Sequence, residues 1–210
     1  MSFVTFLKNC KTVSPGHLSR EMVSMRQTST LCVVFVYSPG LTSKKNHSQI
    51  EKLKDGDVKI ELFEDIAPNH VKRIKELADD GKYDNVVFHR VIYGFMAQTG
   101  DVKFGKIEGY KRRYAGQGGS NYPDLDAEFS SIKYEEGTVG MARAQNPNSA
   151  NSQFFIMFNR SPNLDGNYTV FGKVINGQEI VNSIKRGAMS DNGSVINPDI
   201  MKKVSIKSDK

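Results

Sequence analysis

The stretch that decides the fold runs from residue 86 to residue 102 and reads Val86-Val-Phe-His-Arg-Val-Ile-Tyr-Gly-Phe-Met-Ala-Gln-Thr-Gly-Asp-Val102. It begins with β-branched and aromatic residues, which is typical of a buried strand. The pair Tyr93-Gly94 interrupts the run before a second short strand. Because side chains alternate along a strand, we expect Phe88 and Arg90 to share one face, and Met96 and Gln98 to share another. The stretch therefore predicts a rigid frame for a cation, an amide and apolar side chains, which is the make-up of a small binding site.

The elements around this stretch are short strands separated by turns, with two helices. Residues 68–80 predict an amphipathic helix that starts near Pro68, ends at Gly81 and buries a stripe of apolar side chains. The second helix is predicted over residues 178–185. The further strands are predicted at residues 58–62, 137–142, 153–158, 168–174 and 202–206. This pattern favours an antiparallel barrel or sandwich over a doubly wound sheet.

Charge divides the 210-residue chain into two parts. Residues 1–50 hold six Lys or Arg and one acid, whereas residues 51–210 hold 23 basic and 22 acidic residues, so the net charge of +6 belongs mostly to the first part. A nucleic-acid-binding domain needs a basic face of its own, and we therefore expect no nucleic-acid partner. We predict a basic extension over 1–50 and one domain over 51–210.

The predicted extension leaves the location of the protein open. It contains a short apolar run over 31–37 that follows Arg26, which would suit a secretory signal and a periplasmic or secreted protein. The run is short and no clean cleavage site follows it, so a disordered tail on a cytoplasmic protein is the alternative. Cys10 and Cys32, the only cysteines, both lie here and match no metal-binding pattern. No stretch has the ~20 apolar residues of a membrane-spanning helix.

Several kinds of catalysis lack their residues. No histidine pairs with another ligand at metal-binding spacing, and we place His70 on the exposed side of the first helix. Residues 116–119 are rich in glycine but lack the strand-to-helix setting of a phosphate loop. No serine lies in a nucleophile elbow. We therefore expect neither a metal nor a cofactor nor a covalent intermediate.

Two long motifs carry a resemblance to a known family. The first is the stretch from Phe88 to Asp101, and the second runs from Gly140 to Ile156 as Gly-Met-Ala-Arg-Ala-Gln-Asn-Pro-Asn-Ser-Ala-Asn-Ser-Gln-Phe-Phe-Ile. Together they resemble the cyclophilin family of peptidyl-prolyl cis-trans isomerases, and are closer to its bacterial branch. The resemblance covers roughly residues 53–207. It implies a mainly β fold, namely a closed eight-stranded antiparallel β-barrel with two capping α-helices.

The resemblance also implies a function and a set of site residues. The function is acceleration of rotation about X–Pro peptide bonds, with proline-containing polypeptides, in unfolded chains or exposed loops, as substrates. Arg90 matches the catalytic arginine, which would donate to the prolyl nitrogen, and Gln98 matches the amide on the carbonyl side. The residues implied for substrate binding are Phe95, Met96, Ala142, Arg143, Ala144, Gln153, Phe155, Leu164 and Tyr168. The alternative is a binding module or chaperone of the same fold with little turnover.

Three positions depart from the eukaryotic pattern of the family. Asn163 stands where Trp is expected, Tyr168 where His is expected, and Arg143 where Asn is expected. Asn163 removes a large apolar wall and an indole donor. We therefore expect isomerase activity to remain and the drug cyclosporin to bind weakly. We expect the protein to be a monomer.

Overall fold

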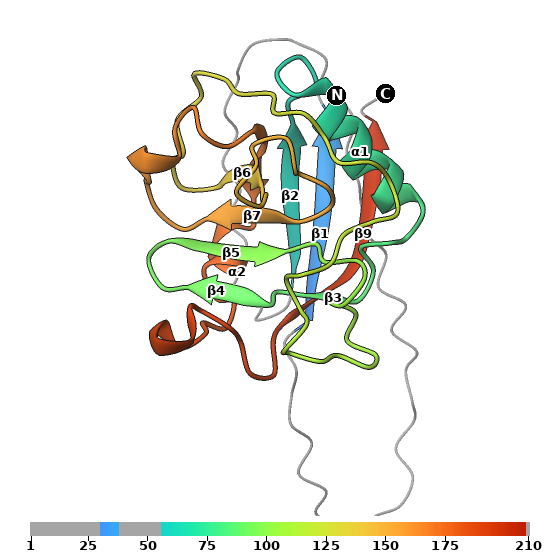
Figure 1. Ribbon diagram of the computed structural model, residues 1–210, viewed down its shortest axis with the longest axis vertical. Coiled ribbons are helices and arrows are strands. Elements are labelled where there is room, and N and C mark those ends of the chain that lie inside the picture. Colours follow the sequence, from blue (N-terminus) through green and yellow to red (C-terminus); the bar gives the residue numbers. More distant parts are fainter. Residues whose placement is uncertain (1–29, 38–55, 209–210) are drawn as a thin grey trace, which may run out of the picture.

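The computed structural model describes residues 30–37 and 56–208 (Figure 1). Its strands are β1 (Thr30–Tyr37), β2 (Asp57–Leu62), β3 (Val86–Val87), β4 (Arg90–Ile92), β5 (Met96–Thr99), β6 (Thr138–Met141), β7 (Phe154–Met157), β8 (Val170–Asn176) and β9 (Ile200–Ser208). Its helices are α1 (Pro68–Asp79) and α2 (Gln178–Val181), and two short 3-10 turns are η1 (Pro162–Leu164) and η2 (Met189–Asp191). The predicted mainly β fold with two helices is confirmed. Helix α2 is shorter than predicted because the amides of Ser183 and Ile184 bond three residues back, which tightens the chain into a turn.

The strands of the described residues form one sheet in the order β3-β9-β1-β2-β8-β6-β7-β5-β4. The expected closed eight-stranded antiparallel barrel is wrong: the sheet has nine strands, β1 pairs in parallel, and no ladder joins the edges β3 and β4 within the described residues. These two edges are separated along the chain by Phe88 and His89 alone. The chain thus turns from pairing with β9 to pairing with β5, and this break leaves the sheet open.

Strand β1 lies between β2 and β9 and runs parallel to both (Figure 1). It contains the apolar run 31–37, for which the sequence left a signal or a tail as alternatives; in the structure its backbone belongs to the sheet. Residues 1–29 and 38–50 of the predicted extension lie outside the described residues. The domain boundary at residue 50 stays a prediction.

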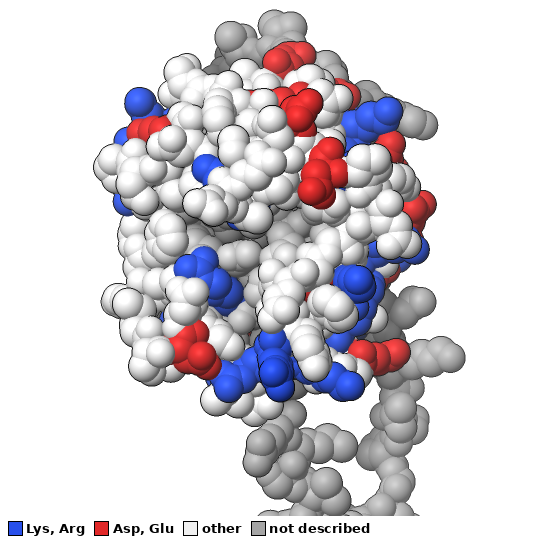
Figure 2. All heavy atoms as spheres, viewed as in Figure 1, with Lys and Arg blue, Asp and Glu red and all other residues white. Residues whose placement is uncertain are grey.

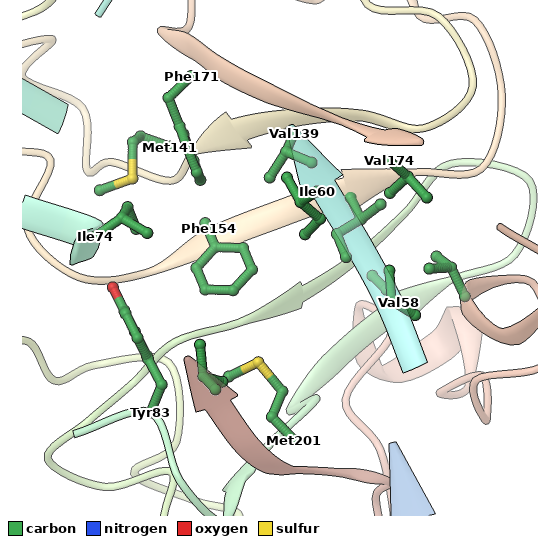
Figure 3. Packing of buried hydrophobic residues seen from close by; sticks show 14 of the residues in the cluster. Val58, Ile60, Ile74, Tyr83, Val139, Met141, Phe154, Phe171, Val174 and Met201 are labelled. Atoms are coloured by element: carbon green, nitrogen blue, oxygen red, sulfur yellow. The ribbon is translucent and has the colours of Figure 1, made fainter. Parts of the chain in front are cut away.

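The main core lies between the inner face of the sheet and helix α1 (Figure 3). Phe154 stands at its centre, packed edge-on against Tyr83 and Phe171 with ring centroids 5.6 and 6.0 Å apart. The Tyr83 hydroxyl donates to the Ser152 carbonyl over 2.8 Å, so this buried phenol has a partner. Helix α1 contributes the predicted stripe of Val71, Ile74, Leu77 and Ala78, all of which are buried.

The start of α1 explains why His70 is buried, whereas the sequence analysis placed it on an exposed side. Ala67 provides no side-chain cap, and the carboxylate of Glu128 takes that role by accepting from the amides of Asn69 and His70, each over 3.1 Å. The Nδ1 atom of His70 lies 2.6 Å from the same carboxylate. A distant loop therefore covers this side of the helix, which the helical period alone could not predict. No helix among the described residues is long and apolar enough to cross a membrane.

Candidate functional site

Alternation along three strands separates core residues from site residues. On one face, Val91 of β4, Ala97 of β5 and Phe154 of β7 all belong to the main core. On the other face, Arg90 pairs with Gln98, and Gln98 pairs with Phe155, so these three side chains form a row across the sheet. The predicted hairpin and its alternation are confirmed for β4 and β5.

Phe88 does not share the face of Arg90, contrary to the sequence-based expectation. Its side chain is fully buried in the main core, while Arg90 is only partly buried on the opposite side. The reason is the break between β3 and β4, where the chain changes pairing partner and the period-two alternation is lost.

A chain of side-chain hydrogen bonds orients the polar groups of the row. Arg90 Nη1 donates to Gln98 Oε1 over 3.2 Å, and Gln98 Nε2 donates to Gln153 Oε1 over 3.0 Å. Gln153 Nε2 donates to the carbonyls of Gly116 and Gly118 over 3.0 and 2.7 Å. Because Gln153 must turn its nitrogen toward these carbonyls, its oxygen faces Gln98, and this in turn points the Gln98 oxygen at Arg90.

Asn192 holds the other side of Arg90 and was missed by the sequence analysis. Its carbonyl accepts from Arg90 Nε over 3.1 Å and its Oδ1 accepts from Nη2 over 3.0 Å. Asn192 has a left-handed backbone with φ of 47°, which asparagine tolerates well. The dipeptide Asn192-Gly193 is a turn signal that could have marked the segment, although nothing local connects it to a residue 102 positions earlier.

The apolar residues of the predicted site meet in a second cluster, separate from the main core. Its buried members include Met96, Phe155 and Leu164, with exposed fractions of 2, 5 and 6 %. Phe95, Ala142 and Tyr168 pack against it and are partly exposed. The structure therefore brings together six of the seven predicted apolar residues, all but Ala144, on the same side of the sheet as Arg90 and Gln98.

Arg143 packs against Tyr168 of this cluster and is held there by hydrogen bonds to backbone carbonyls. Its guanidinium lies 4.4 Å from the centroid of the Tyr168 ring, and Tyr168 packs edge-on against Phe155 at 5.9 Å. The same guanidinium donates to the carbonyls of Asn167 and Ala144 over 2.9 and 3.0 Å. The Ala144 amide donates to the Ser149 hydroxyl, so this amide is already engaged within the protein. Arg143 and Ala144 thus form a prearranged rim.

Asn163, at the position where a Trp was expected, does not close the cluster. It lies in η1 beside Leu164, and its side chain is exposed. Its Oδ1 accepts from the Ser161 hydroxyl over 3.0 Å, which holds the side chain within its own turn.

Burial sets the electrostatics of the row. Partial desolvation lowers the pKa of Arg90 from its ordinary value, while the nearby Tyr168 phenol acts in the opposite direction. A guanidinium nevertheless stays charged in proteins. Burial lowers the pKa of the neighbouring His89 to about 4, so this imidazole is neutral at pH 7. Among the described residues, no group of three His, Cys, Asp or Glu side chains could hold a metal ion.

Comparison with known proteins identifies relatives of this arrangement. The family model described as "Cyclophilin type peptidyl-prolyl cis-trans isomerase/CLD" matches residues 47–206. A "Probable peptidyl-prolyl cis-trans isomerase" of Brucella suis is 60% identical over 161 residues, which cover 76% of this chain and 82% of the relative. A "Peptidyl-prolyl cis-trans isomerase-like 3" of Gallus gallus is 40% identical over 135 residues, which cover 62% of this chain and 77% of the relative.

Solved structures show the same likeness. A Cryptosporidium parvum cyclophilin type peptidyl-prolyl cis-trans isomerase, solved in the presence of the dipeptide Ala-Pro, superposes with a TM-score of 0.59 at 33% identity. The match covers 70% of this chain and 89% of that chain. The cyclophilin AquaCyp293 from Hirschia baltica superposes with a TM-score of 0.58 at 27% identity, covering 70% of this chain and 68% of that chain.

Proposed function

Because the chain belongs to the cyclophilin-type peptidyl-prolyl cis-trans isomerase family, we propose that the row of Arg90, Gln98 and Phe155 catalyses rotation about X–Pro bonds. The observation that carries the proposal is the junction of an oriented guanidinium with an apolar cluster on one face of the sheet. The proline ring would lie on the cluster, against Phe95, Met96, Phe155 and Leu164. The Ala-Pro dipeptide named for the Cryptosporidium parvum structure supports this choice of substrate.

The chemistry requires a hydrogen-bond donor rather than a nucleophile. The planar amide resists rotation with a barrier of ~18–20 kcal/mol because its C–N bond has partial double-bond character. In the twisted transition state this conjugation is lost, and the prolyl nitrogen gains a lone pair that can accept a hydrogen bond. A donor that reaches this nitrogen only when the amide is twisted lowers the barrier, because it binds the transition state better than the ground state.

Arg90 has donors to spare for this role. Within the described residues, three of its five N–H groups are donated, to Gln98 Oε1, to the Asn192 carbonyl and to Asn192 Oδ1. One N–H on each terminal nitrogen remains for substrate. Because Asn192 and Gln98 hold the guanidinium plane from two sides, little reorganisation is needed when the substrate twists.

Gln98 would hold the carbonyl side of the substrate. One hydrogen of its Nε2 is donated to Gln153, which leaves the second for a substrate carbonyl. The path of the polypeptide on either side of the proline would be lined by Gln153, Ala142, Arg143, Ala144 and Tyr168. An acceleration of about 10⁵ requires ~7 kcal/mol of preferential transition-state binding, which one charge-assisted bond, desolvation and positioning can supply together.

The direct test measures cis–trans exchange of a short Ala-Pro peptide by NMR, with wild type and Arg90→Ala. We expect wild type to accelerate exchange and the variant to lose about 10²–10³ of this acceleration, as for removal of one oriented donor. Arg160→Ala is the control, because Arg160 is an exposed arginine that pairs with Glu135 and Asp165. A wild-type protein that binds the peptide without accelerating exchange would establish the alternative, a binding module of the same fold.

We also propose that cyclosporin binds weakly, because the exposed Asn163 side chain turns toward Ser161 and leaves the cluster without an indole wall. Calorimetry should give a dissociation constant above the micromolar range for wild type and tighter binding for Asn163→Trp. A submicromolar constant for wild type would refute the proposal.

A further inference from the structure

A strongly basic loop follows the β4–β5 hairpin and is not used by the proposed mechanism. This basic loop, residues 103–114, carries five of the 23 basic and one of the 22 acidic residues of the segment 51–210. The remainder of that segment therefore has a slightly negative net charge, whereas the loop has a positive one. Figure 2 shows Lys and Arg side chains gathered in the lower half of the face that it draws.

The basic loop is built around a buried carboxylate. Asp101, which is fully buried, accepts from the backbone amides of Lys103 and Phe104 over 3.0 and 2.8 Å, and from those of Gly116 and Gly118 over 2.8 and 3.1 Å. These amides would otherwise attract an anion into the loop itself. Because these amides already donate to Asp101, an external anion would contact the Lys and Arg side chains of the loop instead.

These side chains surround a hollow with aromatic walls. The hollow encloses about 300 Å³ and is lined by Phe104 and Tyr114 together with Lys103, Lys106 and Lys111, and Glu108 is its single acid. The rings of Phe104 and Tyr114 lie 5.9 Å apart. An apolar floor under several cations suits an extended polypeptide that has acidic side chains.

Three of the cations have no acidic partner in the part of the chain that the structure describes. Lys103, Lys111 and Arg113 are exposed and make no ion pair with any described residue. Lys103 lies 5.1 Å from the centroid of the Phe104 ring, and the Arg113 guanidinium lies 5.9 Å from that of Tyr114. Cation–π contacts hold these two side chains near the hollow and leave their N–H groups available.

The loop joins the proposed active site at both of its ends. It begins a few residues after Gln98, and the carbonyls of Gly116 and Gly118, just after it, accept from Gln153. In addition, Arg112 pairs with Asp191 over 2.5 Å, next to the Asn192 that holds Arg90. A polypeptide bound at the proline site would therefore have its flanking residues close to the basic loop.

We propose that the basic loop binds an acidic segment of the client polypeptide that flanks the isomerised X–Pro bond. The proposal rests on the proposed function, since it takes the occupant of the hollow to be the same chain that presents the proline. Each exposed ion pair contributes little, so the preference depends on several cations acting together and on low salt.

The experiment compares two labelled peptides with the full chain by fluorescence anisotropy. Both contain Ala-Pro, one flanked by four Glu and the other by four Gln, with the flank placed on either side in separate peptides. We expect wild type to bind one Glu peptide about tenfold more tightly than its Gln counterpart at low salt, and this preference to shrink in 0.5 M salt. The triple variant Lys103→Glu, Lys111→Glu, Arg113→Glu should lose the preference.

The matched control is the triple variant Lys72→Glu, Lys173→Glu, Lys202→Glu, which changes the net charge equally at exposed positions of α1, β8 and β9. It should keep the preference, and both triple variants should isomerise the Gln peptide like wild type. Equal affinity of wild type for the two peptides, or a preference that survives in the loop variant, would overturn the proposal. Tighter binding of a 12-nucleotide single-stranded oligothymidine, lost in the loop variant, would overturn it in favour of nucleic acid. Failure of wild type to isomerise the Gln peptide would instead contradict the proposed function, because the charge preference is measured by binding alone.

Discussion

The two faces of the same three strands differ in what they do. The inner face of β4, β5 and β7 is mostly apolar and buried, with Val91, Ala97 and Phe154 packed in the main core. The outer face has Arg90, Gln98 and Phe155 in one row, partly open to solvent. Adjacent residues of one strand therefore serve stability and chemistry separately, and substitutions can separate the two.

The largest effect on stability is expected for Phe154→Ala on the inner face. Phe154 is fully buried between Tyr83 and Phe171, and removal of such a ring leaves a cavity that costs about 3–5 kcal/mol in free energy of unfolding. Urea denaturation measures the loss, and Phe129→Ala at a side chain that is 46% exposed is the control. Activity per folded molecule should stay near wild type; a large loss there would show that the faces are not independent.

Acid should lower the free energy of unfolding by a somewhat smaller amount, through His89 in the break between β3 and β4. Burial lowers the pKa of His89 to about 4, against about 6.5 in an unfolded chain. At a pH between these two values the unfolded chain binds a proton that the folded chain does not. The free energy of unfolding therefore decreases as the pH is lowered through this range, by up to about 3 kcal/mol.

Two further groups act in the same direction. Burial lowers the pKa of His70 despite the opposing effect of Glu128. Burial alone would raise the pKa of Glu128, but its hydrogen bonds from His70 and Asn69 outweigh this and lower it. Urea denaturation between pH 7 and pH 4 should show a shallower loss for His89→Gln than for wild type. Identical pH profiles would contradict a neutral, buried His89.

A smaller loss in free energy of unfolding, about 1–3 kcal/mol, is expected for Gly140→Ala, because the added methyl group clashes with side chains of the outer face. Gly140 pairs with Phe155, and a Cβ there would lie 2.3 Å from the Tyr134 hydroxyl and 2.8 Å from the tip of the Phe155 ring. Displacement of Phe155 should also weaken binding of an Ala-Pro peptide, as measured by NMR titration.

Tyr134→Phe provides the rescue for this variant. The Tyr134 hydroxyl is buried without a hydrogen-bond partner among the described residues, so its removal alone should cost little stability, and it eliminates the nearest clash. The double variant should therefore be more stable than Gly140→Ala. Equal stability of the two would show that the hydroxyl is not the obstacle.

The sequence was sufficient where local periodicity decides the structure. The stripe of α1 and the hairpin from Arg90 to Gln98 follow from the 3.6- and 2-residue periods. The family resemblance was sufficient to predict that apolar residues far apart in the chain, such as Phe95 and Leu164, lie together.

The sequence-based predictions were wrong or incomplete where a segment distant in the chain determines the environment of a residue. Glu128 buries His70, and Asn192 holds Arg90, across separations of 58 and 102 residues that leave no local signal. The break at Phe88 and His89 also depends on a change of pairing partner, from β9 to β5, and this opens the sheet that the resemblance would close.

The most direct measurement compares Arg90→Ala with Val91→Ala, two neighbouring residues of β4 on opposite faces. For each variant, peptide cis–trans exchange and the free energy of unfolding are measured under the same conditions. We predict that Arg90→Ala loses about 10²–10³ in acceleration with little change in stability, whereas Val91→Ala loses about 1–3 kcal/mol of stability and keeps its activity per folded molecule. Full acceleration by folded Arg90→Ala would contradict the account.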